Sequence, residues 1–242
     1  MNVYRQIWIY IKFSVKLFIQ KPGLSTLTTI VRFFPAWKTH LAEGKNSVTD
    51  NIPWLTFPSI HFLKKIINSQ MIVFEYGSGG STLFWSGKTK EVVSVEHDGA
   101  WYSKIKNELE IRQIRNVSYF LLEPEDDPDY ALKSAAKPED YISEDESAVG
   151  KKFERYVKKI DEYPDEYFDI ILIDGRARPS CIAHGMKKLK PQGYLVIDNS
   201  ERNYYFKHFE FGKSHWERKD FPGPSPYNYH FSQTTFLKKT GL

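Results

Sequence analysis

The alternation of apolar runs with helical segments from Met71 onward is the feature that most constrains the fold. Five runs rich in β-branched and aromatic residues stand between stretches with helical spacing: MIVFEY, EVVSVEHD, VSYFLLEP, FDIILIDG and GYLVIDNS. Near-continuous apolar strands connected by helices are typical of a parallel sheet that is covered on both faces. The sequence therefore predicts a doubly wound α/β fold with three layers, αβα.

Four carboxylates follow four of these runs. Glu75, Glu96, Asp174 and Asp198 each stand at the end of a predicted strand. In an open α/β sheet, ligands bind beyond the carboxyl ends of the strands. We therefore expect these side chains to surround one ligand site.

The first strand leads into the glycine-rich stretch GSGGST, which ends at Thr82. Glycines let the backbone approach a ligand closely, and the N–H groups of the next helix point to the same place. Two features oppose a pyrophosphate there: Glu75 would repel it, and Thr82 replaces the third glycine of the G-x-G-x-x-G pattern. Glu96 stands 21 positions after Glu75, where an acidic residue binds ribose hydroxyls. A ligand with a ribose, an amine and no phosphate fits this pattern.

These stretches together make the chain resemble class I S-adenosylmethionine-dependent methyltransferases. VFEYGSGGST is similar to the glycine-rich first motif of the family, VVSVEHD to its second, FDIILIDG to its fourth, and LKPQGYLVIDN to the turn and strand that follow. The resemblance spans 71–199 and implies a Rossmann-like methyltransferase sheet with S-adenosylmethionine as cofactor. The cofactor-binding residues that it implies are Glu75, Gly77, Ser78, Gly79, Gly80, Ser81, Thr82, Glu96, His97, Asp98, Trp101 and Asp174.

The C-terminal segment fits the same family. HWERKDF and FSQTTFLKK both read as strands, separated by the Pro- and Gly-rich stretch PGPSPYNYH. They would make the antiparallel final pair of such a sheet, which is otherwise parallel. The connecting stretch, with Tyr227, Tyr229 and His230, forms either a long hairpin or a wall of the acceptor pocket.

Methyl transfer requires alignment of the acceptor with the methyl group and removal of the acceptor's proton. Asp174, Arg176 and Asp198 are the candidate catalytic residues. Asp174, Asp198 and Asn199 could also bind Mg²⁺ or another divalent cation, an arrangement that resembles catechol-type O-methyltransferases. That family has a lysine where this chain has Ala177, which leaves the base to Asp174, Arg176, His184 or another group. Alternatively, the aspartates cap helices, and Arg176 pairs with one of them or binds an anionic acceptor.

Residues 1–69 are predicted to precede the methyltransferase domain, which spans 70–242. Residues 1–20 read as a basic amphipathic helix, with Arg5, Lys12 and Lys16 on one side and Ile7, Ile11, Val15 and Phe18 on the other. The favoured interpretation is a helix packed on its own domain or on a second copy; the other is peripheral attachment to an anionic inner membrane surface. The stretch 23–69 is expected to be an irregular lid segment followed by a helix. Its residues Trp54, Phe57 and His61 either touch a ligand or fill the core.

Charge is distributed unevenly along the chain, although the net charge is only +4. Residues 1–65 carry nine Lys/Arg against two acids, and residues 123–148 carry ten acids against two lysines. The acidic stretch is expected to be an exposed, solvated insertion or a recognition surface for a basic substrate. No nucleic-acid-binding motif is present, so nucleic acid is not an expected partner. The single cysteine, Cys181, excludes an internal disulfide and fits a cytoplasmic location; with His184 it is expected to be a packing residue.

The sequence thus favours an S-adenosylmethionine-dependent methyltransferase that acts on a hydroxyl group of a small molecule, sugar or glycan. Two alternatives stay open. One is an aminopropyl-transferring polyamine synthase on the same fold. The other is a catalytically silent, membrane-proximal binding module that uses the N-terminal helix.

Overall fold

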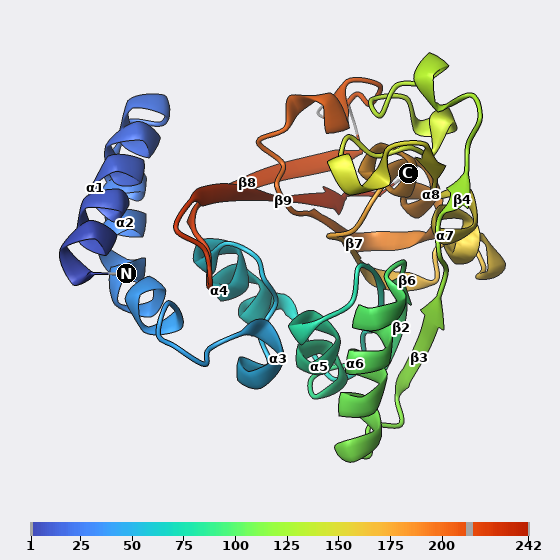
Figure 1. Cartoon of the computed structure of the whole chain (residues 1–242), viewed down its shortest axis with the longest axis horizontal. Coiled ribbons are helices and arrows are strands. Elements are labelled where there is room, and N and C mark those ends of the chain that lie inside the picture. Colours follow the sequence, from blue (N-terminus) through green and yellow to red (C-terminus); the bar gives the residue numbers. More distant parts are fainter. Residues whose placement is uncertain (1, 212–214, 242) are drawn as a thin grey trace.

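The computed structural model describes residues 2–211 and 215–241, and within them the chain forms one seven-stranded sheet (Figure 1). The strand order is β3-β2-β1-β6-β7-β9-β8. These strands are β1 Ile72–Tyr76, β2 Glu91–Glu96, β3 Val117–Leu121, β6 Phe168–Ile173, β7 Leu189–Ile197, β8 Trp216–Pro224 and β9 Phe231–Lys239. The first five in this order are parallel, and β9 is antiparallel to both β7 and β8. The predicted parallel sheet with a C-terminal antiparallel pair is confirmed.

The α-helices are α1 Val3–Gln20, α2 Leu24–His40, α3 Ser47–Asp50, α4 Phe57–Ile66, α5 Gly80–Ser86, α6 Gly99–Ile111, α7 Glu154–Lys158 and α8 Arg178–Lys188. Short 3-10 helices lie at Tyr130–Leu132, Pro138–Asp140, Glu146–Ala148, Lys159–Glu162 and Asn203–Phe206. A second, two-stranded sheet pairs β4 Glu125–Asp126 with β5 Lys151–Lys152.

Successive side chains of β1 enter two different hydrophobic cores. Phe74 packs in one core with Tyr156 of α7, and α8 lies on the same face. Val73 packs in the other core with Leu63 of α4 and Trp85 of α5. Because alternate residues of a strand point to opposite faces, this pattern means that helices cover both sides of the sheet. The predicted three-layer architecture is confirmed.

The segment before β1 is more regular than predicted. The 17-residue helix α2 occupies much of the stretch that we expected to be irregular. It contains Pro35 and several threonines, which lower helix propensity. Trp37 of α2 is fully buried against the domain, and this packing outweighs the weak local signal. Leu55 and Ile60 join the same core, so residues 1–69 share a core with the sheet.

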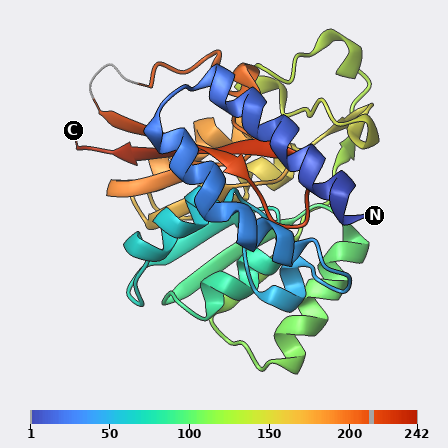
Figure 2. The same ribbon diagram turned by 90° about the vertical axis from the view of Figure 1, so that its left-hand side faces the viewer.

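Helices α1 and α2 lie side by side on the outside of the molecule, beside the β8–β9 hairpin (Figures 1 and 2). The predicted helix at 1–20 is confirmed, but it packs through a different face. Tyr10, Ser14 and Leu17 are buried, whereas the apolar stripe that contains Ile11 and Val15 is exposed. The expectation that the helix packs on its own domain is therefore confirmed, but the packing face contains Tyr10 and Leu17 instead of the stripe.

The acidic stretch 123–148 is more than a solvated loop. Ala136, Ile142 and Ala148 are buried, and Ala148 joins the core that contains α7 and α8. The β4–β5 pairing closes the base of the insertion, with Lys151 opposite Asp126. The insertion thus forms part of the covering layer on that face of the sheet.

Candidate active site

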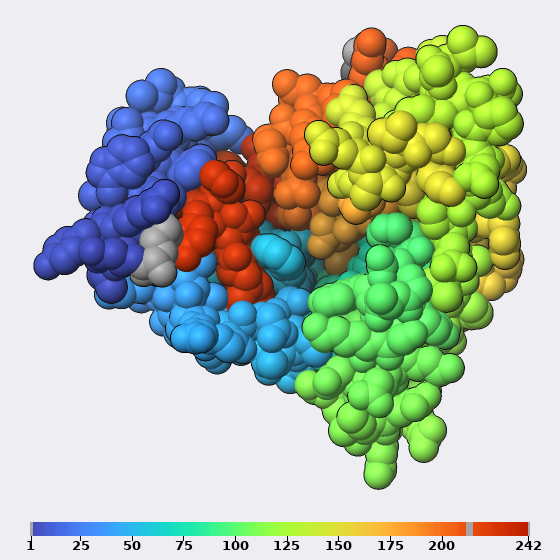
Figure 3. Space-filling model, in the orientation of Figure 1, coloured from blue at the N-terminus to red at the C-terminus, as the bar shows by residue number. Residues whose placement is uncertain are grey.

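A cavity of about 550 Å³ opens beyond the carboxyl ends of β1, β2, β6 and β7. It corresponds to the hollow at the centre of the face shown in Figure 3, between the cyan and green segments and the red C-terminal hairpin. This volume is typical of a site for a cofactor or small molecule. The prediction that a ligand site lies at these strand ends is therefore matched by a cavity.

The loop from Gly77 to Ser81 forms one wall of the cavity. Gly77 has a φ of +91°, and a Cβ there would lie 2.7 Å from the backbone oxygen of Asp174. A Cβ on Gly80 would lie 2.0 Å from the backbone oxygen of Ser47. Close approach of backbone to backbone therefore requires glycine at both positions. At Gly79, by contrast, the nearest atom belongs to the Trp101 ring, at an ordinary contact distance of 3.7 Å.

Glu75 and Thr82 lie beneath this loop and are fully buried. The hydroxyl of Thr82 donates to Glu75 Oε1 and accepts from the backbone N–H of Gly79 at 3.0 Å. Burial raises the pKa of Glu75 to about 7. The sequence led us to expect that Glu75 and Thr82 touch the cofactor; the structure instead places both behind the wall, where they hold the loop.

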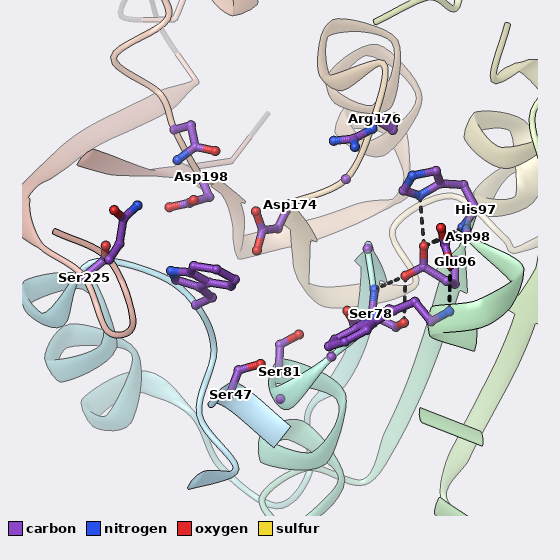
Figure 4. Close-up of a pocket in the computed structure, with 18 of the residues that line it drawn as sticks. Ser47, Ser78, Ser81, Glu96, His97, Asp98, Asp174, Arg176, Asp198 and Ser225 are labelled. Atoms are coloured by element: carbon purple, nitrogen blue, oxygen red, sulfur yellow. Dashed lines mark hydrogen bonds and ion pairs between the residues drawn. The ribbon is translucent and has the colours of Figure 1, made fainter. Parts of the chain in front are cut away.

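Glu96 stands at the end of β2, at the centre of a second group of cavity residues (Figure 4). Its Oε2 accepts from the N–H and the hydroxyl of Ser78, at 3.0 and 2.8 Å. Its Oε1 accepts from the N–H groups of His97 and Asp98, at 2.8 and 3.0 Å. Burial alone would raise the pKa of Glu96, but the hydrogen bonds with His97, Asp98 and Ser78 outweigh it and lower that pKa. The carboxylate is therefore charged and held in one orientation.

Trp101 lies against the glycine-rich loop. Its ring N–H donates to the backbone oxygen of Ser78 at 2.9 Å. Asp98 caps α6 by accepting from the N–H of Trp101 at 2.7 Å. The cap and the ring bond together fix the indole in the cavity wall beside Glu96.

Asp174 and Asp198 follow the neighbouring strands β6 and β7 and share the buried guanidinium of Arg178. Arg178 donates to Asp174 Oδ1 at 3.2 Å and to the backbone oxygen of Asp198. Thr234 donates to Asp198 Oδ1 at 2.7 Å. Burial raises the pKa of both aspartates, and the charge of Asp174 raises that of Asp198 further, while Arg178 opposes both shifts. Two carboxyl groups with pKa values raised in this way are suited to hold or release a proton near neutral pH.

The predicted metal site at Asp174, Asp198 and Asn199 has hard oxygen donors, and all three line the cavity. One oxygen of each aspartate already accepts a hydrogen bond, and Arg178 places a fixed positive charge beside them. Across residues 2–211 and 215–241, no group of three His, Cys, Asp or Glu side chains is arranged to hold a metal ion. A set of two aspartates and Asn199 is not a group of that kind, so the metal site stays a prediction, and we derive no chemical step from a metal.

Of the remaining candidate residues, one lines the cavity and two lie outside it. Arg176 lines the cavity, and its guanidinium lies 3.4 Å from Asp145 of the acidic insertion. His184 lies outside the cavity, where its ring contacts Asp161 at 2.7 Å, so it is not placed to act as the base. Cys181 is fully buried in the core, as its predicted packing role requires.

Sequence reasoning missed most of the opposite wall, which is built from Ser47, Ser225, Asn228 and Ser232 together with Trp54. Trp54 was a lid candidate and does line the cavity, whereas Phe57 is buried in the core and His61 packs against Phe33.

In the stretch PGPSPYNYH, the residues that line the cavity are Ser225 and Asn228. The hydroxyl of Tyr227 binds Asp50, while the rings of Tyr229 and His230 pack on Trp37 and Phe13. The only signal in the sequence was the turn-rich composition of that stretch.

The cavity wall is acidic. Its ionisable groups are the carboxyl groups of Glu96, Asp98, Asp174 and Asp198 and the guanidinium of Arg176, and Glu96 is held in its charged form. An excess of carboxylates favours a cationic ligand and repels phosphate. The structure therefore supports the sequence argument against a pyrophosphate. The acidic groups that would oppose a phosphate are those of the cavity wall, whereas Glu75 lies behind it.

No protein-family model matches the sequence, and no curated protein sequence matches it either. The fold, however, is similar to that of solved methyltransferases. An O-methyltransferase from Bacillus cereus in complex with SAH has a TM-score of 0.52 at 14% identity, covering 90% of this chain and 92% of that chain. An rRNA methylase from Streptococcus thermophilus has a TM-score of 0.52 at 15% identity, covering 75% and 93%. A methyltransferase-like protein from Silicibacter pomeroyi has a TM-score of 0.51 at 23% identity, covering 78% and 90%. At these identities the likeness establishes the fold.

Proposed function

We propose that this chain is an S-adenosylmethionine-dependent methyltransferase that methylates a hydroxyl group of a polar small molecule or sugar. The observation that carries the proposal is that three features surround one cavity. They are a glycine-rich loop, a carboxylate fixed at the end of β2 and an acidic wall. The fold shared with methyltransferases, one of them in complex with SAH, supports it. The acidic wall suits a cofactor that carries a sulfonium and an ammonium group.

The cofactor half of the cavity is the side that contains Ser78, Gly79, Glu96 and Trp101. When bound, S-adenosylmethionine supplies an electrophilic methyl group. Glu96 is placed to accept ribose hydroxyls, but its Oε2 already accepts two hydrogen bonds from Ser78. The Ser78 hydroxyl must therefore turn away, and it can keep its contact with the Tyr119 hydroxyl at 2.6 Å. Trp101 offers a flat apolar surface beside this site.

The acceptor half is the opposite side of the cavity. Figure 4 shows Asp198 and Ser225 on that side, with Asp174 between them and the Glu96 group. Hydroxyl and amide side chains there, together with the exposed ring of Trp54, can bind an acceptor rich in hydroxyl groups. The acidic wall opposes a nucleic-acid acceptor, because phosphates would approach the same carboxylates.

Asp174 is the residue that we assign as the base. Its side chain is 24% exposed and faces the cavity between the two halves, whereas Asp198 is nearly closed off. Burial raises the pKa of Asp174, which makes its carboxylate a better proton acceptor than an ordinary aspartate. Arg178 then stabilises the carboxylate in its charged form between turnovers.

An aminopropyl transferase for polyamines is the second candidate, because an acidic wall also suits a cationic acceptor. The position of Gly175 counts against it. A Cβ there would lie 2.0 Å from the Tyr156 hydroxyl, so this strand end has no room for a further acidic side chain.

The test is transfer of a labelled methyl group from S-adenosylmethionine to a panel of sugars, catechols and small hydroxylated metabolites. We expect a labelled product that Glu96→Ala abolishes, and the same reaction with a chelator tests the predicted metal site. A parallel reaction with decarboxylated S-adenosylmethionine and putrescine tests the second candidate. Binding of S-adenosylmethionine without transfer to any acceptor would favour the non-catalytic alternative, and absence of binding would refute the proposal.

A further inference from the structure

Helix α1 exposes a continuous apolar stripe. Trp8, Ile11 and Val15 are 62%, 55% and 53% exposed, and Tyr4 and Ile19 extend the stripe in both directions. Spacings of three and four residues place these side chains on one face of the helix. The buried face of the same helix is formed by different residues, Tyr10 and Leu17, which hold α1 on the domain.

Helix α2 adds a second exposed apolar set. Leu24 and Val31 are 83% and 74% exposed, and Leu27 lies between them with the same helical spacing. Both helices lie side by side on the outside of the molecule (Figure 2). Soluble monomers seldom expose so many large apolar side chains in one region, and such regions mark interaction surfaces. The exposed faces of α1 and α2 are therefore a candidate docking surface.

The charge around this surface identifies its partner. Residues 2–42 contain six Lys and Arg and no Asp or Glu. Arg5, Lys12 and Lys16 border the α1 stripe, and among the described residues they form no ion pair. Lys12 instead lies over the ring of Trp8, 5.6 Å from its centroid. An apolar stripe with a tryptophan and a cationic border is typical of helices that lie in the interface of an anionic bilayer.

A second copy of the chain is a poorer partner. A two-fold interface would bring the same face of both copies together, so two all-cationic helix pairs would meet. Like charges at an interface oppose association, whereas anionic headgroups would neutralise them. No helix within the described residues is long and apolar enough to cross a bilayer.

We propose that the α1–α2 hairpin docks the protein on the surface of an anionic lipid membrane. The apolar stripe enters the headgroup boundary, and Arg5, Lys12 and Lys16 contact lipid phosphates. This inference does not depend on the proposed methyltransferase activity.

Co-sedimentation of the full chain with lipid vesicles tests the proposal. We expect binding to vesicles of phosphatidylcholine and phosphatidylglycerol at a ratio of about 7:3, and weak binding to pure phosphatidylcholine. Trp8→Ser/Ile11→Ser/Val15→Ser is expected to weaken binding at least about tenfold. Lys12→Glu/Lys16→Glu is expected to weaken it at least about 30-fold, because loss of the two basic residues costs about 1 kcal/mol each and the new carboxylates are repelled by the lipid.

Matched controls change equally exposed residues elsewhere. Ile111→Ser/Leu132→Ser removes exposed apolar side chains, and Lys90→Glu/Lys137→Glu makes the same change in charge. Both controls should bind like the wild type, and circular dichroism checks that every variant is folded. Three results would overturn the proposal: no binding of the wild type, equal loss in the controls, or a dimer in light scattering that the triple serine variant dissociates without any vesicle binding.

Discussion

The hydroxyl of Thr82 joins the buried carboxylate of Glu75 to the backbone of the glycine-rich loop. It donates to Glu75 and accepts from the N–H of Gly79 at 3.0 Å. Thr82 stands at the position of the third glycine in a dinucleotide-binding motif. In this chain the position requires a hydroxyl group, because that group makes both hydrogen bonds. A carboxylate two residues before the loop therefore anchors the loop from beneath, while Glu96 and the two aspartates form the charged cavity wall.

Replacing Thr82 tests this anchor. Thr82→Val keeps the shape but removes the hydroxyl, which takes one hydrogen-bond partner from the buried Glu75 and leaves the N–H of Gly79 without its side-chain acceptor. We expect a loss of about 1–3 kcal/mol in the free energy of unfolding. Thr82→Ser, which keeps the hydroxyl, should lose less than Thr82→Val in the same urea titration. If the valine variant is the more stable of the two, the bond does not anchor the loop.

The pH dependence of stability tests the burial of Glu75. Its pKa is about 7 in the folded chain against an ordinary value of 4.5, so the folded state binds the proton more tightly. This contribution to stability is fully present below the unfolded pKa and is lost as the pH rises through about 7. The loss is on the order of 3 kcal/mol.

Glu75→Gln removes the titrating group. The decline in stability between about pH 4.5 and pH 7 should become shallower, while Asp174 and Asp198 still contribute in the same direction. Glu110→Gln, on the exposed face of α6, is the control and should keep the wild-type slope. An unchanged slope in Glu75→Gln, measured by urea unfolding across this range, would show that Glu75 keeps an ordinary pKa.

The close contact between α3 and α5 makes Gly80 irreplaceable. In Gly80→Ala the new Cβ would meet the backbone oxygens of Ser47 and Ile52 at 2.0 and 2.6 Å, and backbone cannot turn aside as a side chain can. We expect a loss of about 3 kcal/mol, or roughly 10 °C in Tm for a chain of this size. Gly87→Ala, with its nearest atom at 3.9 Å, should change Tm little. Equal Tm values for the two variants in a thermal scan would refute the contact.

Much of the sheet and half of the site could be predicted from the sequence. The strands β1, β2, β6 and β7 each contain a mostly apolar run, and parallel strands bring their carboxyl ends to one edge of the sheet. Glu96, Asp174 and Asp198 therefore had to meet, and the cavity lies where they meet.

The opposite wall could not be predicted, because long-range packing creates it. Ser47 belongs to α3, and Ser225 and Asn228 follow β8; neither segment has a local pattern that points to the cavity. The burial of Glu75 behind the cavity wall could not be predicted either. A side chain at the end of a strand can point into a cavity or into the layer beneath it, and the sequence does not distinguish the two. The face of α1 that is exposed could not be predicted from helical spacing. The helix has apolar residues on two faces, and packing on the domain decides which of them is buried.

Under the proposed function, the pH–rate profile tests Asp174 as the base. A base works when deprotonated, so kcat/KM should fall as the pH drops through the pKa of Asp174. Burial raises that pKa, so the midpoint of this limb should lie well above the ordinary value of 3.8. Asp174→Asn should lower kcat at least about 100-fold and remove the limb. An unchanged limb in that variant would assign the proton acceptor to another group.

Calorimetric titration with S-adenosylhomocysteine tests the cofactor site most directly. The wild type should bind with a Kd between about 1 μM and 1 mM, the usual range for enzyme ligands. Glu96→Ala should weaken binding at least about 30-fold, because it removes the charged acceptor for the ribose. Ser78→Ala, which removes a competing donor from the same oxygen, should stay within about threefold of the wild type or bind more tightly. No binding by the wild type, or equal affinity in Glu96→Ala, would contradict the account.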